Sequence, residues 1–75
     1  MSLYNRLDVF IKENSFNTVD YNYTKLTIGE YLRNGKVSWN NLTLNMQELL
    51  IEFEKTEKIT GLVPKNAQLN HYLFL

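Results

Sequence analysis

The stretch LTIGEYLRNGKVSWNNLTLNMQELLIEFEKTEK, residues 26–58, decides the fold that we expect. Its first part has the form of a capping box. The Thr27 hydroxyl can accept a hydrogen bond from the backbone N–H of Glu30, and the Glu30 carboxylate can reach back to the N–H of Thr27. Gly35 can take the left-handed conformation that ends a helix without a clash at Cβ. These features predict a short helix over 28–34.

A long amphipathic helix is predicted after the glycine turn, over residues 38–58. Ser38 can cap it, and the apolar residues that follow recur at steps of three and four, which places them on one helix face. These residues are Trp39, Leu42, Met46, Leu49, Leu50 and Phe53. Gly61 and Pro64 then prevent the helix from continuing.

The start of this long helix has an alternative at Asn45, which has Glu48 three residues further on. Asn and Thr are weak helix formers, and they are frequent between Ser38 and Asn45. If the helix begins at Asn45, residues 38–44 form a turn or a strand. In either case a short helix, a turn and a longer helix follow one another, which is the order of a helix-turn-helix motif.

The flanking segments complete the predicted fold. A capped helix is predicted over 3–12, with Leu7, Phe10 and Ile11 on one face and packed against the long helix. The alternation of apolar and polar residues over 16–24 predicts a half-buried strand. Residues 59–63 are expected to form a short strand or an extended connection. Residues 71–75 are expected to form a buried final strand, or the end of a helix that starts after Asn66.

This order of elements is that of a winged helix, in which the last two strands form the wing. We therefore expect a single small domain of the α+β class, residues 1–75, mostly helical and winged-helix-like, with a helix-turn-helix-like core. The alternative is an all-α domain of four helices.

The composition excludes several classes of protein. The chain has no cysteine, which excludes disulfides and thiolate metal sites. No apolar run is long enough to span a membrane, and residues 1–14 lack the basic start and apolar core of a signal peptide, so we expect a cytoplasmic location. Asn, Lys, Ile, Tyr and Phe, which AT-rich codons encode, are well represented. We therefore expect a source in a low-GC bacterium, its phages or another mobile element.

Enzyme chemistry is hard to place on this sequence. The single histidine, His71, lies in an apolar segment, where a histidine is more often packed or exposed than catalytic. The sequence shows no nucleophile beside a base, no phosphate loop and no dinucleotide fingerprint. We therefore expect a non-enzymatic protein that uses no cofactor, metal ion or small-molecule substrate.

Nucleic-acid binding has candidate residues if 38–58 is a recognition helix, because Asn can pair with adenine through two hydrogen bonds. The candidates for base contacts are Asn40, Asn41, Thr43 and Asn45, and the candidates for phosphate contacts are Arg33 and Lys36. The formal net charge is +0, from 8 basic and 8 acidic residues. This balance disfavours nucleic-acid binding, which draws much of its affinity from Lys and Arg on phosphates.

A second apolar pair on the long helix favours a protein partner. Leu44 and Ile51 are seven residues apart, so they align on the side roughly opposite the predicted core face. Such a pair is either buried between layers or covered by a partner. Together with Glu48 and Lys55 it forms the predicted partner interface. We therefore expect a small regulatory protein that binds a host protein, or itself as a homodimer, with a winged-helix DNA-binding regulator as the alternative.

Overall fold

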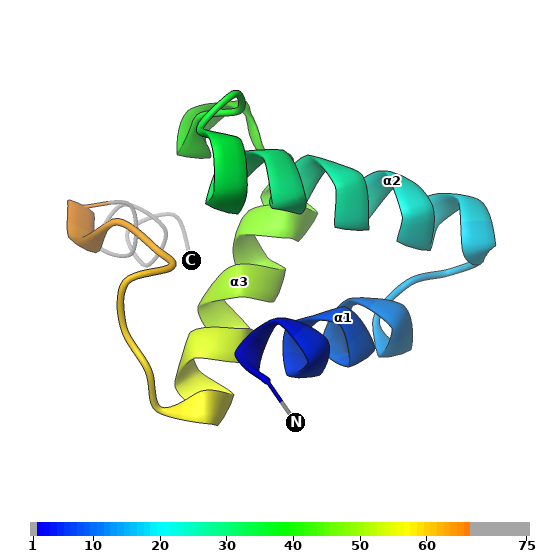
Figure 1. The fold of residues 1–75 in the computed structure, drawn as a ribbon, viewed down its shortest axis with the longest axis horizontal. Coiled ribbons are helices and arrows are strands. Elements are labelled where there is room, and N and C mark those ends of the chain that lie inside the picture. Colours follow the sequence, from blue (N-terminus) through cyan, green and yellow to red (C-terminus); the bar gives the residue numbers. More distant parts are fainter. Residues whose placement is uncertain (1, 67–75) are drawn as a thin grey trace.

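The computed structural model describes residues 2–66, and in this range the chain is mostly helical and has no strand (Figure 1). Its α-helices are α1 (Leu3–Glu13), α2 (Thr18–Gly29) and α3 (Leu44–Glu57). A π-helical turn, Glu30–Asn34, continues α2, and a 3-10 turn, Trp39–Asn41, precedes α3. The helices α1 and α2 form an antiparallel hairpin on one side of α3, and the chain after α3 runs along its other side (Figure 1).

The predicted helical character is confirmed, but the strand expected over 16–24 is wrong, because these residues begin α2. Asn17 caps this helix, and its side-chain oxygen accepts from the backbone N–H of Asp20 at 2.8 Å. The Asp20 carboxylate accepts from the N–H of Phe16 at 3.0 Å, a reciprocal arrangement like that of a capping box. The cap and the packing of one helix face override the local alternation of apolar and polar residues.

The short helix predicted over 28–34 is the last part of a longer one, so Thr27 does not cap it. Thr27 lies inside α2, where its hydroxyl donates to the carbonyl oxygen of Tyr23 at 2.8 Å. The predicted end is confirmed. Gly35 closes the π-helical turn with φ +64°, the left-handed conformation that glycine takes without strain.

The long helix begins close to the alternative start, and the start at Ser38 is wrong. Thr43 is the N-cap of α3, and its hydroxyl accepts from the N–H of Met46 at 3.2 Å. Residues 39–41 form the separate 3-10 turn. The connection between α2 and α3 is therefore longer than the turn of about three or four residues that defines a helix-turn-helix motif.

The predicted wing has no counterpart in the range that the structure describes. Residues 59–63 contain bends and no strand, and Gly61 takes φ +102° there. The other predicted wing strand, 71–75, and the alternative helix after Asn66 lie outside the described residues.

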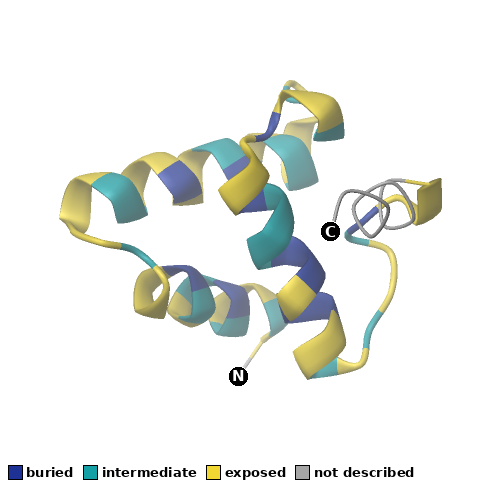
Figure 2. Ribbon diagram, turned by 180° about the vertical axis from the view of Figure 1, so that it is seen from behind, coloured by how far each residue is buried: buried dark blue, intermediate teal, exposed yellow. Residues whose placement is uncertain are grey.

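The core lies between the hairpin and α3, and Figure 2 shows buried residues on the facing sides of these helices. Most of the predicted core is confirmed. The predicted residues that are buried are Leu7, Ile11, Leu42, Met46, Leu50 and Phe53. Phe10 is half-buried and places its ring 5.5 Å from that of Phe53. Trp39 is also half-buried, with its ring 5.8 Å from that of Tyr31.

A second layer covers the other side of α3. The buried Glu54 carboxylate accepts from the backbone N–H groups of Leu62 at 2.8 Å and Val63 at 3.0 Å. The Tyr31 hydroxyl donates to the carbonyl oxygen of Leu62 at 2.6 Å. Val63 joins the core, and Ile51 of α3 is buried in the same cluster. The helix α3 is therefore packed on two sides, by the hairpin and by the segment that follows it.

Candidate protein-interaction surface

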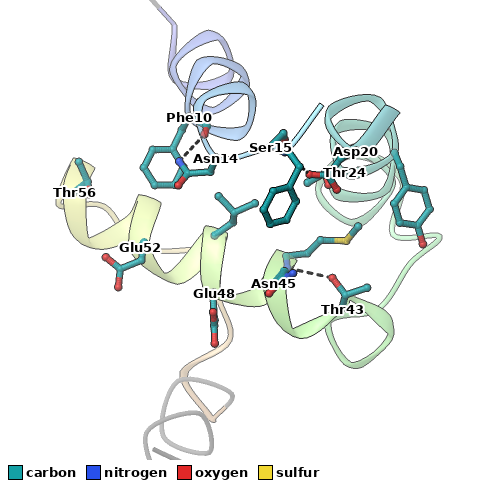
Figure 3. Close-up of a pocket in the computed structure, with 14 residues that line it drawn as sticks. Phe10, Asn14, Ser15, Asp20, Thr24, Thr43, Asn45, Glu48, Glu52 and Thr56 are labelled. Atoms are coloured by element: carbon teal, nitrogen blue, oxygen red, sulfur yellow. Dashed lines mark hydrogen bonds between the residues drawn. The ribbon is translucent and has the colours of Figure 1, made fainter. Parts of the chain in front are cut away.

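An open groove of about 610 Å³ lies between the hairpin and α3 (Figure 3). It is lined by the end of α1, the loop before α2, α2 itself and α3. Among its apolar residues, Met46 is buried, Phe10 and Leu49 are half-buried, and Phe16 and Tyr23 are exposed. The groove thus offers an apolar lining that the described chain leaves open to solvent.

Phe16 has the highest exposure of the large apolar side chains in the described range, at 91%. Its position is nevertheless well fixed, because its backbone N–H donates to Asp20. The two residues before it are also tied, since the side chains of Asn14 and Ser15 donate to carbonyl oxygens near the end of α1. Burying a Phe side chain stabilises a folded protein by about 1.5–3 kcal/mol, and Phe16 does not provide this stabilisation while it is exposed. An exposed aromatic ring on a fixed backbone is well suited to anchor a protein interface.

Exposed apolar side chains continue from Phe16 along α2. Val19 is 77% exposed, and Tyr23 and Leu26 are each more than half exposed. The spacing of these three residues places them on one face of the helix. We refer to Phe16, Val19, Tyr23 and Leu26 as the α2 stripe. A single exposed apolar residue is ordinary, whereas an aligned set beside a groove is typical of an interaction surface.

Among the described residues, the charged side chains that line the groove are all acidic. Asp20 comes from α2, and Glu48 and Glu52 come from α3, where they are one helical turn apart (Figure 3). Lys55 does not line the groove, although its Nζ atom lies 3.8 Å from a carboxylate oxygen of Glu52. The lining of the groove is therefore partly apolar and partly polar, and its charged side chains are acidic.

Several basic side chains lie away from the groove, on the hairpin. The Nζ atoms of Lys12 and Lys25 lie 6.0 and 5.6 Å from the centroid of the Tyr21 ring. The Arg33 guanidinium lies 5.9 Å from the centroid of the Tyr4 ring. None of these three cations lines the groove. The charged lining of the groove is thus acidic, although the net charge of the chain is zero.

The shifted pKa values belong to structural contacts. The Tyr21 hydroxyl donates to Asp8 at 2.6 Å and, together with the nearby Lys25 ammonium, lowers the pKa of Asp8. The hydrogen bond with Tyr21 and the charge of Asp8 raise the pKa of Lys25. Burial, followed by the charge of Glu54, raises the pKa of the Tyr31 hydroxyl. Each shift favours the charge state that the group already has at neutral pH. The shifts of Asp8 and Lys25 describe a favourable contact, and that of Tyr31 describes its burial.

Residues 2–66 contain neither a cluster of metal ligands nor a helix that could span a membrane. No cluster of three or more His, Asp or Glu side chains is placed to hold a metal ion in this range. No helix in the same range is long and apolar enough to cross a membrane.

The predicted partner interface does not form one exposed stripe. Leu44 is 60% exposed, but Ile51 is only 2% exposed, so the expectation that both face solvent is wrong for Ile51. The physical reason is the second layer, which puts Ile51 in the same buried cluster as Val63. Glu48 is half-buried and lines the groove, and Lys55 is exposed beside it.

The nucleic-acid candidates are not displayed together on the start of one helix. Asn40 and Asn41 are exposed in the 3-10 turn, before α3 begins. Thr43 uses its hydroxyl as the cap of α3, and Asn45 lines the groove. Of the two cations, Arg33 lies beside Tyr4, and Lys36 is exposed in the connection between α2 and α3.

Sequence reasoning missed the α2 stripe because residues 16–24 were assigned to a strand. The pattern that reveals it was present, since Val19, Tyr23 and Leu26 follow one another at steps of four and three. Asn17 and Asp20 also have the spacing of a helix cap.

Comparison of the chain with models of known protein families, with curated proteins and with solved structures found no match in any of the three. The case for a function therefore comes from the surface itself.

Proposed function

We propose that this chain is a small non-enzymatic protein-interaction module, a regulatory protein of a phage or mobile element that binds a segment of another protein. Its binding surface consists of the α2 stripe and the adjoining groove. The observation that carries the proposal is the exposure of Phe16, an aromatic ring on a fixed backbone at the edge of the groove.

The arrangement matches the way in which a groove between helices takes an amphipathic helix. In such complexes the bound helix places apolar residues from successive turns into the groove. Here Phe10, Leu49 and Met46 offer apolar contacts within the groove, and Phe16 and Tyr23 offer them at its edge.

The test is a selection of displayed random peptides against the immobilised full-length chain. We expect the enriched peptides to bind the wild-type chain at least about tenfold more tightly than the Phe16→Ser variant, since the loss of one anchor at an interface costs more than about 1.4 kcal/mol. Val9→Ser is the matched control, because Val9 is an exposed apolar residue that does not line the groove. Enriched peptides that bind Phe16→Ser and the wild type equally would overturn the proposal.

The competing proposal is DNA binding by a regulator of the winged-helix class. The exposure of Lys36, Asn40 and Asn41 in the connection between α2 and α3 favours it. It predicts duplex binding that weakens steeply with salt and is reduced in the variants Lys36→Ala and Asn41→Ala, while Phe16→Ser has no effect. Because the two proposals depend on different residues, one set of variants separates them.

A further inference from the structure

We infer that the groove is built for a basic amphipathic segment of the partner, one that carries apolar residues on one face and Lys or Arg beside them. This inference rests on the proposed function and names the chemistry of the partner. Two features of the groove carry it: the open apolar lining and the acidic side chains at its borders.

The acidic residues lie on both walls. Glu48 and Glu52 come from α3, and Asp20 comes from α2 across the groove (Figure 3). The carboxylates of Glu48 and Glu52 point away from α2 (Figure 3), so a segment bound in the groove would meet Asp20 on one side and the two glutamates where it extends over α3. Lysine or arginine at these positions complements the charge, whereas an acidic or neutral segment leaves it unmatched.

The close spacing of these acidic side chains lowers the stability of the chain. Like charges at positions i and i+4 of a helix, as in Glu48 and Glu52, repel each other. One carboxylate oxygen of Asp20 accepts a hydrogen bond from the backbone N–H of Phe16, which fixes the Asp20 charge close to Phe16. The described ion pair at this border joins Glu52 to Lys55 at 3.8 Å, and both side chains are more than half exposed, so solvent screens it. A cation from a partner would relieve the repulsion while its apolar neighbours fill the groove.

The size of the molecule sets the length of the segment. The described chain measures 32 × 25 × 25 Å. A helix of about 14 residues is about 21 Å long, so it can lie along the groove and present apolar residues from three or four turns. A peptide of this length is therefore a suitable probe.

The experiment compares two fluorescein-labelled peptides of about 14 residues with leucine at the same helical positions. One carries lysine at every polar position and the other carries glutamate. Fluorescence anisotropy with the full-length chain should show that the lysine peptide binds at least about tenfold more tightly than the glutamate peptide. This preference should shrink at high salt, because exposed charges are screened.

Charge-neutralising variants locate the effect. The double variant Glu48→Gln, Glu52→Gln keeps the size of both side chains, and we expect it to bind the lysine peptide about three- to tenfold more weakly than the wild type. Glu30→Gln is the matched control, because Glu30 is exposed and does not line the groove. Circular dichroism of each variant establishes that the helices are intact.

Three outcomes overturn the inference. Equal binding of the two peptides would show that the groove has no preference for a basic partner. If Phe16→Ser weakens the binding of both peptides alike, the proposed function still stands without that preference. If the Phe16→Ser variant binds the lysine peptide as tightly as the wild type does, the peptide is bound by charge alone. A dimer in native mass spectra that Phe16→Ser dissociates would show that a second copy of the chain occupies the surface.

Discussion

Glu54 is a carboxylate in a place where an apolar residue would normally pack, and its hydrogen bonds explain its presence. It is 5% exposed and accepts the backbone N–H groups of both Leu62 and Val63. Buried polar groups need such partners, because an unsatisfied donor or acceptor away from water is costly. One side chain of α3 thus holds the segment that forms the second layer of the core.

Replacing Glu54 with alanine should destabilise the chain by about 2–4 kcal/mol, because two backbone donors lose their acceptor. Urea unfolding followed by circular dichroism measures this loss. Glu54→Gln is the control, since its amide oxygen can still accept a hydrogen bond, and it should retain part of the lost stability. If Glu54→Ala unfolds at the same urea concentration as the wild type, the carboxylate does not hold the segment in solution.

At the scale of the elements, the sequence predicted helices well where several local features agree. The end of the helix at Gly35 is confirmed, because the left-handed conformation there follows from the residue type alone. The predicted burial of Met46, Leu50 and Phe53 in α3 is also confirmed, because a helical period can be read without knowledge of the neighbours. Leu49, predicted on the same face, is half-buried and lines the groove. The prediction of a strand over 16–24 is wrong because tyrosines alternate there with polar residues, while the apolar residues also fit a helical period. Only packing decides between the strand period and the helix period.

The cap of α2 gives a direct test of this correction. Asn17→Ala should cost about 1 kcal/mol, because the first turn of α2 loses the side-chain acceptor that bonds the N–H of Asp20. Thr27→Ala should stay within about 0.5 kcal/mol of the wild type, because Thr27 lies inside the helix and caps nothing. Thermal unfolding of the two variants compares them. If Thr27→Ala is less stable than Asn17→Ala, the result would indicate that a helix starts at Thr27.

On the scale of the whole molecule, the proposed binding surface could not be predicted from the sequence. Leu44 and Ile51 have similar side chains and share one side of α3, yet one is 60% exposed and the other 2% exposed. The segment after α3 returns along the helix (Figure 1) and adds Val63 to the core cluster that contains Ile51. Such a return depends on contacts between distant residues, among them the hydrogen bond from the Tyr31 hydroxyl to the carbonyl oxygen of Leu62, and no local period encodes it. The proposed interaction surface therefore consists of the α2 stripe and the groove, to which α3 contributes only one wall.

These two residues provide a matched test of the layered fold. Ile51→Lys places a charge in the buried cluster, which costs several kcal/mol. Small domains have about 5–15 kcal/mol of stability in total, so we expect this variant to lose most of its helical circular dichroism signal at 25 °C or to unfold at very low urea. Leu44→Lys adds the same charge on the same side of α3, but at an exposed position, and should remain within about 0.5 kcal/mol of the wild type. If Ile51→Lys is as stable as Leu44→Lys, the segment after α3 does not cover the helix in solution, and Ile51 becomes a candidate for the partner interface again.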